Sequence, residues 1–422
     1  MMRKRALILV CLFIIPFFLT ACFDAHEIGE FTYATMIGIE HGVSDKYRIT
    51  FQILKFAQGS GGGENKGGGQ ETTETVTFDV PALASAFSIA NTNISKVLNF
   101  MHIKAIVISE ELATSGHLGE SVAPLIRYRQ IRRTTNVIVC KGNVEEFIKA
   151  TKPYAGELVT KTIEDLVGNS ENLGYFPKST LNDFYEGIKS PYHALMLIYG
   201  AINKGDNFQE NGLKYEGKTK DSGDYYAGDV PRNGGEGIEL FGSAILDGDK
   251  MVGKLTGFET QLLLMLRGDL KNVSFTIPDP EMPQFSIPIR IQEFEKPKID
   301  IDLNGGNPKI NAKIKIEGDI LTIQSRIHYE DPKKKKILED AFEKYIVEGA
   351  DRVFAKCKVF QADVLNFGTE AVTQFWTIPE WENYNWLEKF GKSELKVEVD
   401  FTIRRTGKLL KNEPIYSSEG KE

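Results

Sequence analysis

Apolar and polar residues alternate with two different periods along the first half of the chain, which predicts strands and helices in turn. Residues 33–39 and 47–56 are rich in Thr, Ile, Tyr and Phe and flank a short polar turn, which is typical of a β-hairpin. Apolar runs at 102–109 and 136–140 indicate buried strands, and helical spacing of apolar residues follows at 144–150. Strands interleaved with helices favour a mixed sheet with helices packed on it.

The second half repeats strand patterns and then carries one long helix. Residues 238–246 and 251–255 flank an Asp-Gly turn and predict a second hairpin. Thr256 and Glu259 have the spacing of a capping box, which begins a helix. Apolar residues recur at helical spacing within residues 333–358 and form one stripe along a predicted helix of about 39 Å. The simplest arrangement is an antiparallel sheet with this helix laid across one face.

These patterns predict an α+β fold class with mixed and antiparallel sheets, packed helices and several domains, including a long helix near the C-terminus that lies on a sheet. Residues 204–237 are dominated by Gly, Asp, Asn, Lys and Glu and keep no apolar period, so we expect a linker there. It would separate an N-terminal α+β region at 22–203, with one or two subdomains, from a C-terminal α+β domain at 238–412. Residues 413–422 form a polar tail.

The first 21 residues have the pattern of a secretion signal peptide, with a basic head, an apolar run and small residues before Cys22. The run is shorter than the roughly 20 residues of a membrane span, and Pro16 disfavours a continuous helix, so cleavage is favoured over retention. Leu19, Thr20 and Ala21 before the cysteine resemble the bacterial lipobox. Only a sulfur nucleophile can form the thioether to diacylglycerol, so Cys22 is the predicted lipidation residue. The alternative is an uncleaved anchor with an incidental cysteine.

Charge and cysteine content indicate how the mature chain attaches to a membrane and whether it contains a disulfide bridge. Cleavage removes three of the 51 basic residues and leaves 48 against 58 acidic ones, a formal charge of −10. A chain with that balance has no net attraction for nucleic acid or anionic lipid, so we expect membrane attachment to come from the acyl chains. Cys140 and Cys357 lie in apolar patterns, which favours two buried free thiols over a disulfide bridge.

No catalytic, metal or cofactor site is predicted beyond the covalent diacylglycerol on Cys22. Gly248 and Lys254 have P-loop spacing, but Leu255 replaces the required hydroxyl residue and an Asp-Gly turn explains the glycine. The six histidines lack metal-ligand spacing, and the nucleophile motif GxSxG is absent from the sequence. The lysines of 333–336 could touch membrane headgroups, although a solvated helix end is the default expectation.

Four stretches carry a family resemblance: Cys22-Phe23-Asp24 with Glu27-Ile28, residues 102–112, residues 242–259, and residues 361–368 with 404–407. They resemble the C-subunit lipoproteins of spore germinant receptors, the Ger(x)C family of endospore-forming bacteria. They keep the family's order and span nearly the whole mature chain. The family's usual Trp after the lipid-bearing cysteine is Phe23 here, and the glycine-rich stretch after Gln58 looks like a local extension.

The resemblance implies a non-enzymatic, lipid-anchored subunit on the outer face of the spore inner membrane, which assembles with A- and B-type membrane subunits and takes part in the germination response. Two other hypotheses stay open. An extracytoplasmic solute-binding lipoprotein would need a cleft between two domains, and the linker at 204–237 is its only support. A lipid-anchored cell-wall hydrolase is disfavoured because the sequence offers no catalytic constellation.

Overall fold

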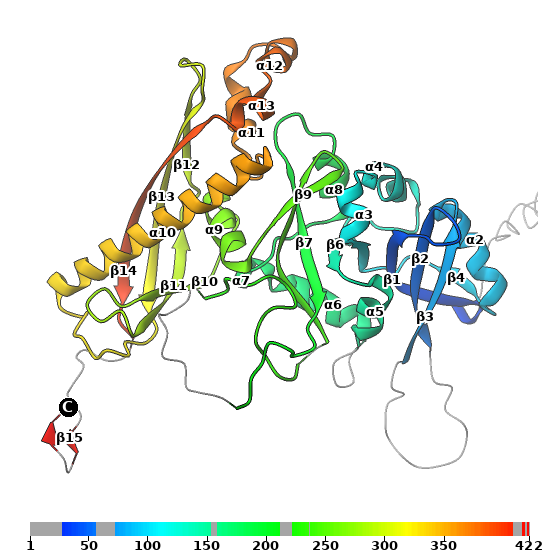
Figure 1. Ribbon diagram of the computed structural model, residues 1–422, viewed down its shortest axis with the longest axis horizontal. Helices are drawn as coiled ribbons and strands as arrows, with labels where there is room; N and C mark the ends of the chain where they lie inside the picture. The colour runs from blue at the N-terminus through cyan, green and yellow to red at the C-terminus, as the bar shows by residue number, and fades with distance from the viewer. Residues whose placement is uncertain are drawn as a thin grey trace, which may run out of the picture.

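The computed structural model describes residues 28–55, 72–152, 158–211, 222–235 and 237–407, with the short pair β15 (Tyr416–Ser417) and β16 (Gly420–Lys421). Two sheets with packed helices make up the described chain (Figure 1), which confirms the predicted α+β class. Within these residues, no helix combines the length and apolar character that a bilayer crossing requires.

The first sheet has nine strands in the order β3-β2-β1-β5-β6-β7-β8-β9, with β4 paired to the start of β1. β1, β5, β6 and β7 are parallel to one another, and the outer strands are antiparallel. The strands are β1 (Phe31–His41), β2 (Tyr47–Lys55), β3 (Thr72–Val80), β4 (Val97–Asn99), β5 (Ala105–Ser109), β6 (Asn136–Lys141), β7 (Leu195–Ile202), β8 (Ile238–Asp247) and β9 (Lys250–Leu255).

Both faces of the central strands are buried, which explains their nearly continuous apolar sequences. In β5, Ile106 and Ile108 join the apolar cluster on one face, while Ala105 and Val107 join the cluster on the other. The helices around this sheet are α2 (Leu83–Asn93), α3 (Glu110–Ser115), α4 (Leu118–Ser121), η2 (Ala123–Arg127), α5 (Val144–Ala150), α6 (Val159–Gly168), α7 (Ser170–Leu173) and α8 (Leu181–Gly187); the short η1 (Ile28–Glu30) precedes β1.

The hairpin β8–β9 forms as predicted, but it completes the first sheet. β7 and β8 are antiparallel neighbours, with Leu195 opposite Leu246 and Ile202 opposite Ile238. The predicted linker at 204–237 therefore connects two paired strands of one sheet. The alternation of apolar residues in a hairpin indicates a half-buried strand pair and does not indicate which sheet it joins. The division of the chain into domains at this segment stays a prediction.

The second sheet has five strands: β10 (Val273–Pro278), β11 (Ser286–Phe294), β12 (Lys298–Asp302), β13 (Lys309–Ile320) and β14 (Glu394–Arg405). β11 and β12 pair in succession along one edge of β13, and both are antiparallel to it. β14 pairs along the other edge in the parallel sense. The expectation of a wholly antiparallel sheet was thus wrong for β14, because the long helical connection before it returns the chain to the starting end of β13.

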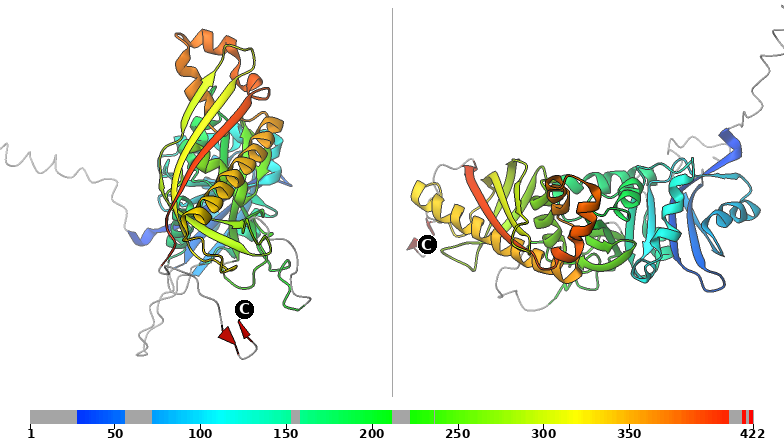
Figure 2. Two further views of the ribbon diagram at one scale, coloured as in Figure 1. Left: turned by 90° about the vertical axis from the view of Figure 1, so that its left-hand side faces the viewer. Right: turned by 90° about the horizontal axis from the view of Figure 1, so that it is seen from above.

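The long helix α10 (Pro332–Phe360) crosses this second sheet, and Figure 2 shows it running over β13 and β14. Asp331 caps it by accepting the backbone N–H of Lys333 at 2.9 Å, which confirms the predicted helix. Thr256 and Glu259 likewise form the predicted capping box of α9. The other helices of this half are α9 (Gly257–Arg267), α11 (Phe367–Ala371), η3 (Val372–Gln374), α12 (Ile378–Tyr384) and α13 (Trp386–Phe390).

The lysines at the start of α10 find acidic partners within the chain. Lys336 lies 2.9 Å from Asp340, and Lys334 Nζ donates to Glu281 at 2.8 Å and 2.5 Å. These two lysines are therefore neutralised by carboxylates of the chain itself. Elsewhere in the chain, Cys140 and Cys357 are buried free thiols, as the apolar patterns predicted.

A turn that is held by a buried carboxylate connects the second half of the chain to the first. Asp363 is fully buried and accepts hydrogen bonds from the backbone N–H of Phe367 at 3.2 Å, that of Gly368 at 2.7 Å and Trp386 Nε1 at 2.9 Å. Its own carbonyl accepts the N–H of Ala194, just before β7, at 3.0 Å. Burial raises the pKa of Asp363 to about 6 although these three donors favour its charged form.

We expect Phe342→Ala to lower the free energy of unfolding by about 3–5 kcal/mol, because truncating a buried aromatic side chain leaves a cavity. Phe342 is fully buried between the helix and the sheet, with its ring centroid 4.3 Å from that of Phe401 and 6.0 Å from that of Phe275. Urea unfolding would measure the loss. Lys344→Ala, on the exposed side of α10, is the control and should change stability by at most about 0.5 kcal/mol.

Asp363 should make stability depend on pH between its unfolded pKa near 3.8 and its folded pKa of about 6. In this window the folded chain holds a proton that the unfolded chain releases, so the stability contribution of Asp363 falls as the pH rises. Relative to Asp363→Asn, we expect the wild type to lose on the order of 2 kcal/mol from pH 4 to pH 7 in urea unfolding. Parallel pH profiles for the two proteins would contradict this, and Glu370→Gln on α11 serves as an exposed control.

Candidate functional site: a cavity between the two sheets

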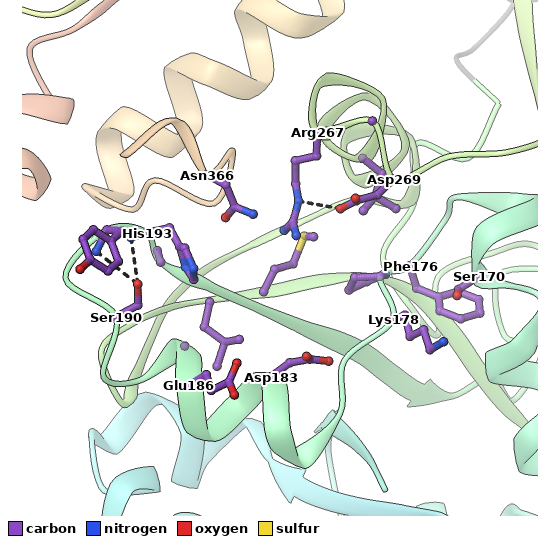
Figure 3. Close-up of a pocket in the computed structure, with 18 of the residues that line it drawn as sticks. Ser170, Phe176, Lys178, Asp183, Glu186, Ser190, His193, Arg267, Asp269 and Asn366 are labelled. Atoms are coloured by element: carbon purple, nitrogen blue, oxygen red, sulfur yellow. Dashed lines mark hydrogen bonds and ion pairs between the residues drawn. The ribbon is translucent and has the colours of Figure 1, made fainter. Parts of the chain in front are cut away.

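A cavity of about 900 Å³ lies where the first sheet meets the helical layer of the second (Figure 3). Its walls come from four segments: α7 with the chain that follows it, α8 with the lead into β7, the end of α9, and the turn that contains Asn366. The floor is apolar, with buried Phe176, Ala194, Met196 and Leu264. An apolar floor with a few polar groups above it is the usual composition of a small-molecule site.

Three polar side chains reach this cavity from separate elements, and Figure 3 shows Arg267, His193 and Asn366 around it. Arg267, the last residue of α9, places Nε 2.8 Å from Asp269 Oδ2, and its Nη1 donates to the carbonyl of Val364 at 3.5 Å. Asn366 has a φ of 63°, a left-handed conformation that asparagine tolerates better than most residues. The buried Asp363 holds the turn on which Asn366 lies, so the cavity wall depends on that carboxylate.

His193 lies in the segment that leads into β7. Ser190 Oγ accepts the backbone N–H of Tyr192 at 3.2 Å and that of His193 at 3.3 Å, which fixes the bend (Figure 3). Burial lowers the pKa of His193, and the positive charge of Arg267 lowers it further, against hydrogen bonds that raise it. The imidazole is therefore neutral near pH 7 and can both donate and accept hydrogen bonds.

The rim of the cavity is charged, and most of the charges are already paired. Glu171 forms an ion pair with Lys271, and Lys178 lies 4.0 Å from the same carboxylate. Asp183 completes the capping box of α8, and Glu186 accepts a hydrogen bond from Asn182 at 2.9 Å. The arrangement can hold a small polar ligand over an apolar floor. Among the described residues, no group of three or more His, Cys, Asp or Glu side chains is placed to hold a metal ion.

Lys254, the lysine of the P-loop-like stretch, lies outside the cavity and has a structural role in the first sheet. Lys254 Nζ donates to Glu110 Oε1 and to Tyr199 Oη, both at 3.0 Å, and the Tyr199 hydroxyl donates to Glu110 Oε2 at 2.7 Å. Burial raises the pKa of Tyr199, and the hydrogen bond to Glu110 raises it further. The network connects β9, β7 and α3, so Lys254 is engaged by partners within the protein.

The residues predicted from sequence and the residues around the cavity are different sets. Leu19, Thr20, Ala21 and Cys22 lie outside the described residues, so their role stays a prediction. Sequence reasoning missed the cavity, because His193, Arg267 and Asn366 share no motif spacing. More than 70 residues separate each of them from the next along the chain. The one available indication was the 361–368 stretch, which contains both Asp363 and Asn366.

Two protein-family models match the chain on either side of the β7–β8 connection. "Spore germination protein N-terminal domain" matches residues 24–201, and "Spore germination B3/ GerAC like, C-terminal" matches residues 241–407. A solved structure described as the GerBC protein is similar to this chain with a TM-score of 0.51 and 16% sequence identity, covering 87% of this chain and 96% of that one. At this identity, the structural likeness shows the fold alone.

Curated relatives align along nearly the full length of the chain. Spore germination protein KC of Bacillus subtilis (strain 168) is 22% identical over 98% of both chains. Spore germination protein B3 of the same organism is 23% identical over 92% of this chain and 95% of its own. With the two family models matched in order over most of its length, the chain belongs to the Ger(x)C family of spore germination proteins.

Proposed function

We propose that this chain is the lipid-anchored subunit of a nutrient germinant receptor in spores. It acts without catalysis, on the outer face of the spore inner membrane, in assembly with A- and B-type membrane subunits. The observation that carries the proposal is the match of both family models, in order, to a chain whose first residues have the pattern of a signal peptide and lipobox. The family supplies the role, and Cys22 supplies the chemistry of attachment.

A diacylglycerol on Cys22 accounts physically for permanent attachment. Each buried methylene contributes about 0.8 kcal/mol, so two acyl chains hold a protein on a bilayer far more firmly than one chain does. Attachment leaves the fold free for contacts with neighbouring proteins. The described fold begins at Ile28, six residues after the predicted lipid-bearing residue, so the body of the protein would be held close to the membrane surface.

The test is Cys22→Ala in spores that carry this chain as their only copy. We expect the variant to keep its fold, to leave the membrane fraction and to lower nutrient-triggered germination, because no thioether can form without the thiol. Cys11→Ala within the apolar run is the matched control and should leave all three readouts unchanged. Full germination with the protein absent from membranes would exclude the requirement for the tether.

A second candidate function, solute binding by the ectodomain, is favoured by one observation, the cavity beside Arg267. It predicts a saturable heat when amino acids, nucleosides or sugars are titrated into the purified chain, and at least tenfold weaker binding by Arg267→Gln, which removes the charge. Lys344→Gln on the far side of α10 is the control. Absence of heat from all three solute classes leaves the assembly role as the function.

A further inference from the structure

One edge of the first sheet collects chain segments that are distant in sequence. β1, β5 and β6 are parallel, so their first residues lie at the same edge. Hydrogen bonds place the lead-in segments side by side: the N–H of Lys104 donates to the carbonyl of Thr35 at 2.9 Å, and that of Asn136 donates to the carbonyl of Lys104 at 3.0 Å. The start of β1, the lead into β5 and the lead into β6 thus form one continuous surface.

The lead into β6 is strongly basic. Four arginines within the seven residues 127–133, which we call the arginine loop, are all exposed, and none of them forms an ion pair with a residue that the structure describes. They are Arg127, Arg129, Arg132 and Arg133. Lys96, just before β4, is also exposed and has no ion pair among those residues. Five such cations in two segments that meet at Phe100 are unexpected in a mature chain with a formal charge of −10.

The arginine loop is fixed in place beside the first residues of the fold. Gln130 Oε1 accepts the backbone N–H of Phe100 at 3.0 Å, and the ring of Tyr128 packs 5.7 Å from that of Phe100. On the other side of the same segment, His102 packs edge-on against Tyr33 of β1 at 4.6 Å, and β4 pairs with residues 31–33 of β1. The segment 97–104 therefore lies between the arginine loop and residues 31–33 at the start of β1.

Apolar side chains accompany the cations on this surface. Val97 and Met101 are each 51% exposed, between the start of β1 and the arginine loop. Burial lowers the pKa of His102, and the charges of Lys104 and Arg132 lower it further, so the local field is positive. Exposed apolar residues among unpaired cations are typical of a surface that meets a lipid headgroup layer.

Nearby acidic groups leave most of this positive charge uncompensated. Glu164 pairs with Lys104, which is not one of the five cations. Asp183 and Glu186 lie on α8, next to the end of the loop: the former is engaged in the α8 capping box and the latter accepts a hydrogen bond from Asn182. The surface therefore remains cationic even when these carboxylates are counted.

We propose that this surface, made of the arginine loop, Lys96, Val97 and Met101, docks on the anionic phospholipid headgroups of the membrane that holds the lipid anchor. The inference rests on the proposed anchor in one respect: six residues from Cys22 to Ile28 span at most about 20 Å, so the edge beside β1 stays near the membrane surface. Guanidinium groups match phosphate oxygens in two-pronged hydrogen bonds. The anchor holds the protein at the bilayer, and the basic surface selects which face lies against it.

The test uses the full mature chain, residues 22–422, with Cys22→Ala so that no acyl chain contributes to binding. Its probes are vesicles of phosphatidylcholine alone and vesicles with about one-third phosphatidylglycerol. We expect binding to the anionic vesicles only, weakened as salt rises from about 0.05 to 0.5 M because surface charges are screened. Replacing the four arginines by Gln should weaken binding at low salt at least tenfold, since each cation near an anionic surface contributes about fivefold.

The matched control removes four exposed cations of the second sheet that also form no ion pair with a described residue: Arg290→Gln, Lys296→Gln, Lys298→Gln and Lys309→Gln. It changes the net charge equally and should alter vesicle binding less than twofold. Equal losses in the two variants, or no binding by the parent chain, would overturn the proposal. If the fourfold arginine variant does not fold, the double variant Arg127→Gln/Arg129→Gln replaces it, with an expected loss of at least fivefold.

This experiment can fail independently of the proposed function. Vesicle binding by the lipid-free chain does not require lipidation, partners or spores, whereas the membrane fraction of Cys22→Ala spores reports on the anchor alone. The lipid-bearing chain with the fourfold arginine variant should still fractionate with membranes, because its acyl chains remain. Binding to phosphatidylcholine vesicles as strong as to anionic ones would assign the contact to Val97 and Met101 and would exclude headgroup recognition.

Discussion

A buried carboxylate, that of Asp363, shapes the turn that meets the first sheet at the junction between the two halves of the chain. Asp363 accepts three hydrogen bonds within its own turn, and its carbonyl binds the N–H of Ala194 at the entrance to β7. A buried carboxylate is costly unless its oxygens are satisfied, so the turn must keep this shape for the charge to be tolerated. This turn also places Asn366 at the cavity. Only glycine fits at position 368, because a Cβ there would lie 1.9 Å from the carbonyl oxygen of Tyr192.

Local structure could be predicted from sequence because its causes are local. The capping box of Thr256 and Glu259 and the apolar stripe of α10 depend on spacings of three to seven residues, and both are present in the structure. Sheet membership depends on contacts that the pattern does not contain. β8 joined the first sheet and β14 joined β13 in the parallel sense, although a half-buried strand reads the same in either position. The cavity was not predictable for the same reason, since His193, Arg267 and Asn366 come from three distant segments that meet only in the folded chain.

Net charge and local charge lead to different expectations about one surface of this protein. A formal charge of −10 disfavours a general attraction to anionic surfaces. Electrostatic attraction acts over a screening length of about 8–10 Å at physiological salt, however, which is smaller than the protein, so the approaching face matters more than the total. The arginine loop was visible in the sequence as four arginines in seven residues. What the sequence could not show is that the loop packs on Phe100, in the segment that also pairs with residues 31–33 of β1, and that no described acidic residue pairs with it.

A tether and an oriented surface have different physical consequences for a receptor subunit. An acyl anchor alone confines the protein to a thin layer and leaves it free to tumble about a short lead, so only part of its encounters present a given face to a neighbour. Restricting rotation raises the effective concentration of that face without adding any contact to the partner. With the first sheet's basic edge against headgroups, the second sheet and α10, which occupy the opposite end of the molecule (Figure 1), would be held away from the bilayer. Under the proposed assembly, that end would be the one available to partner subunits.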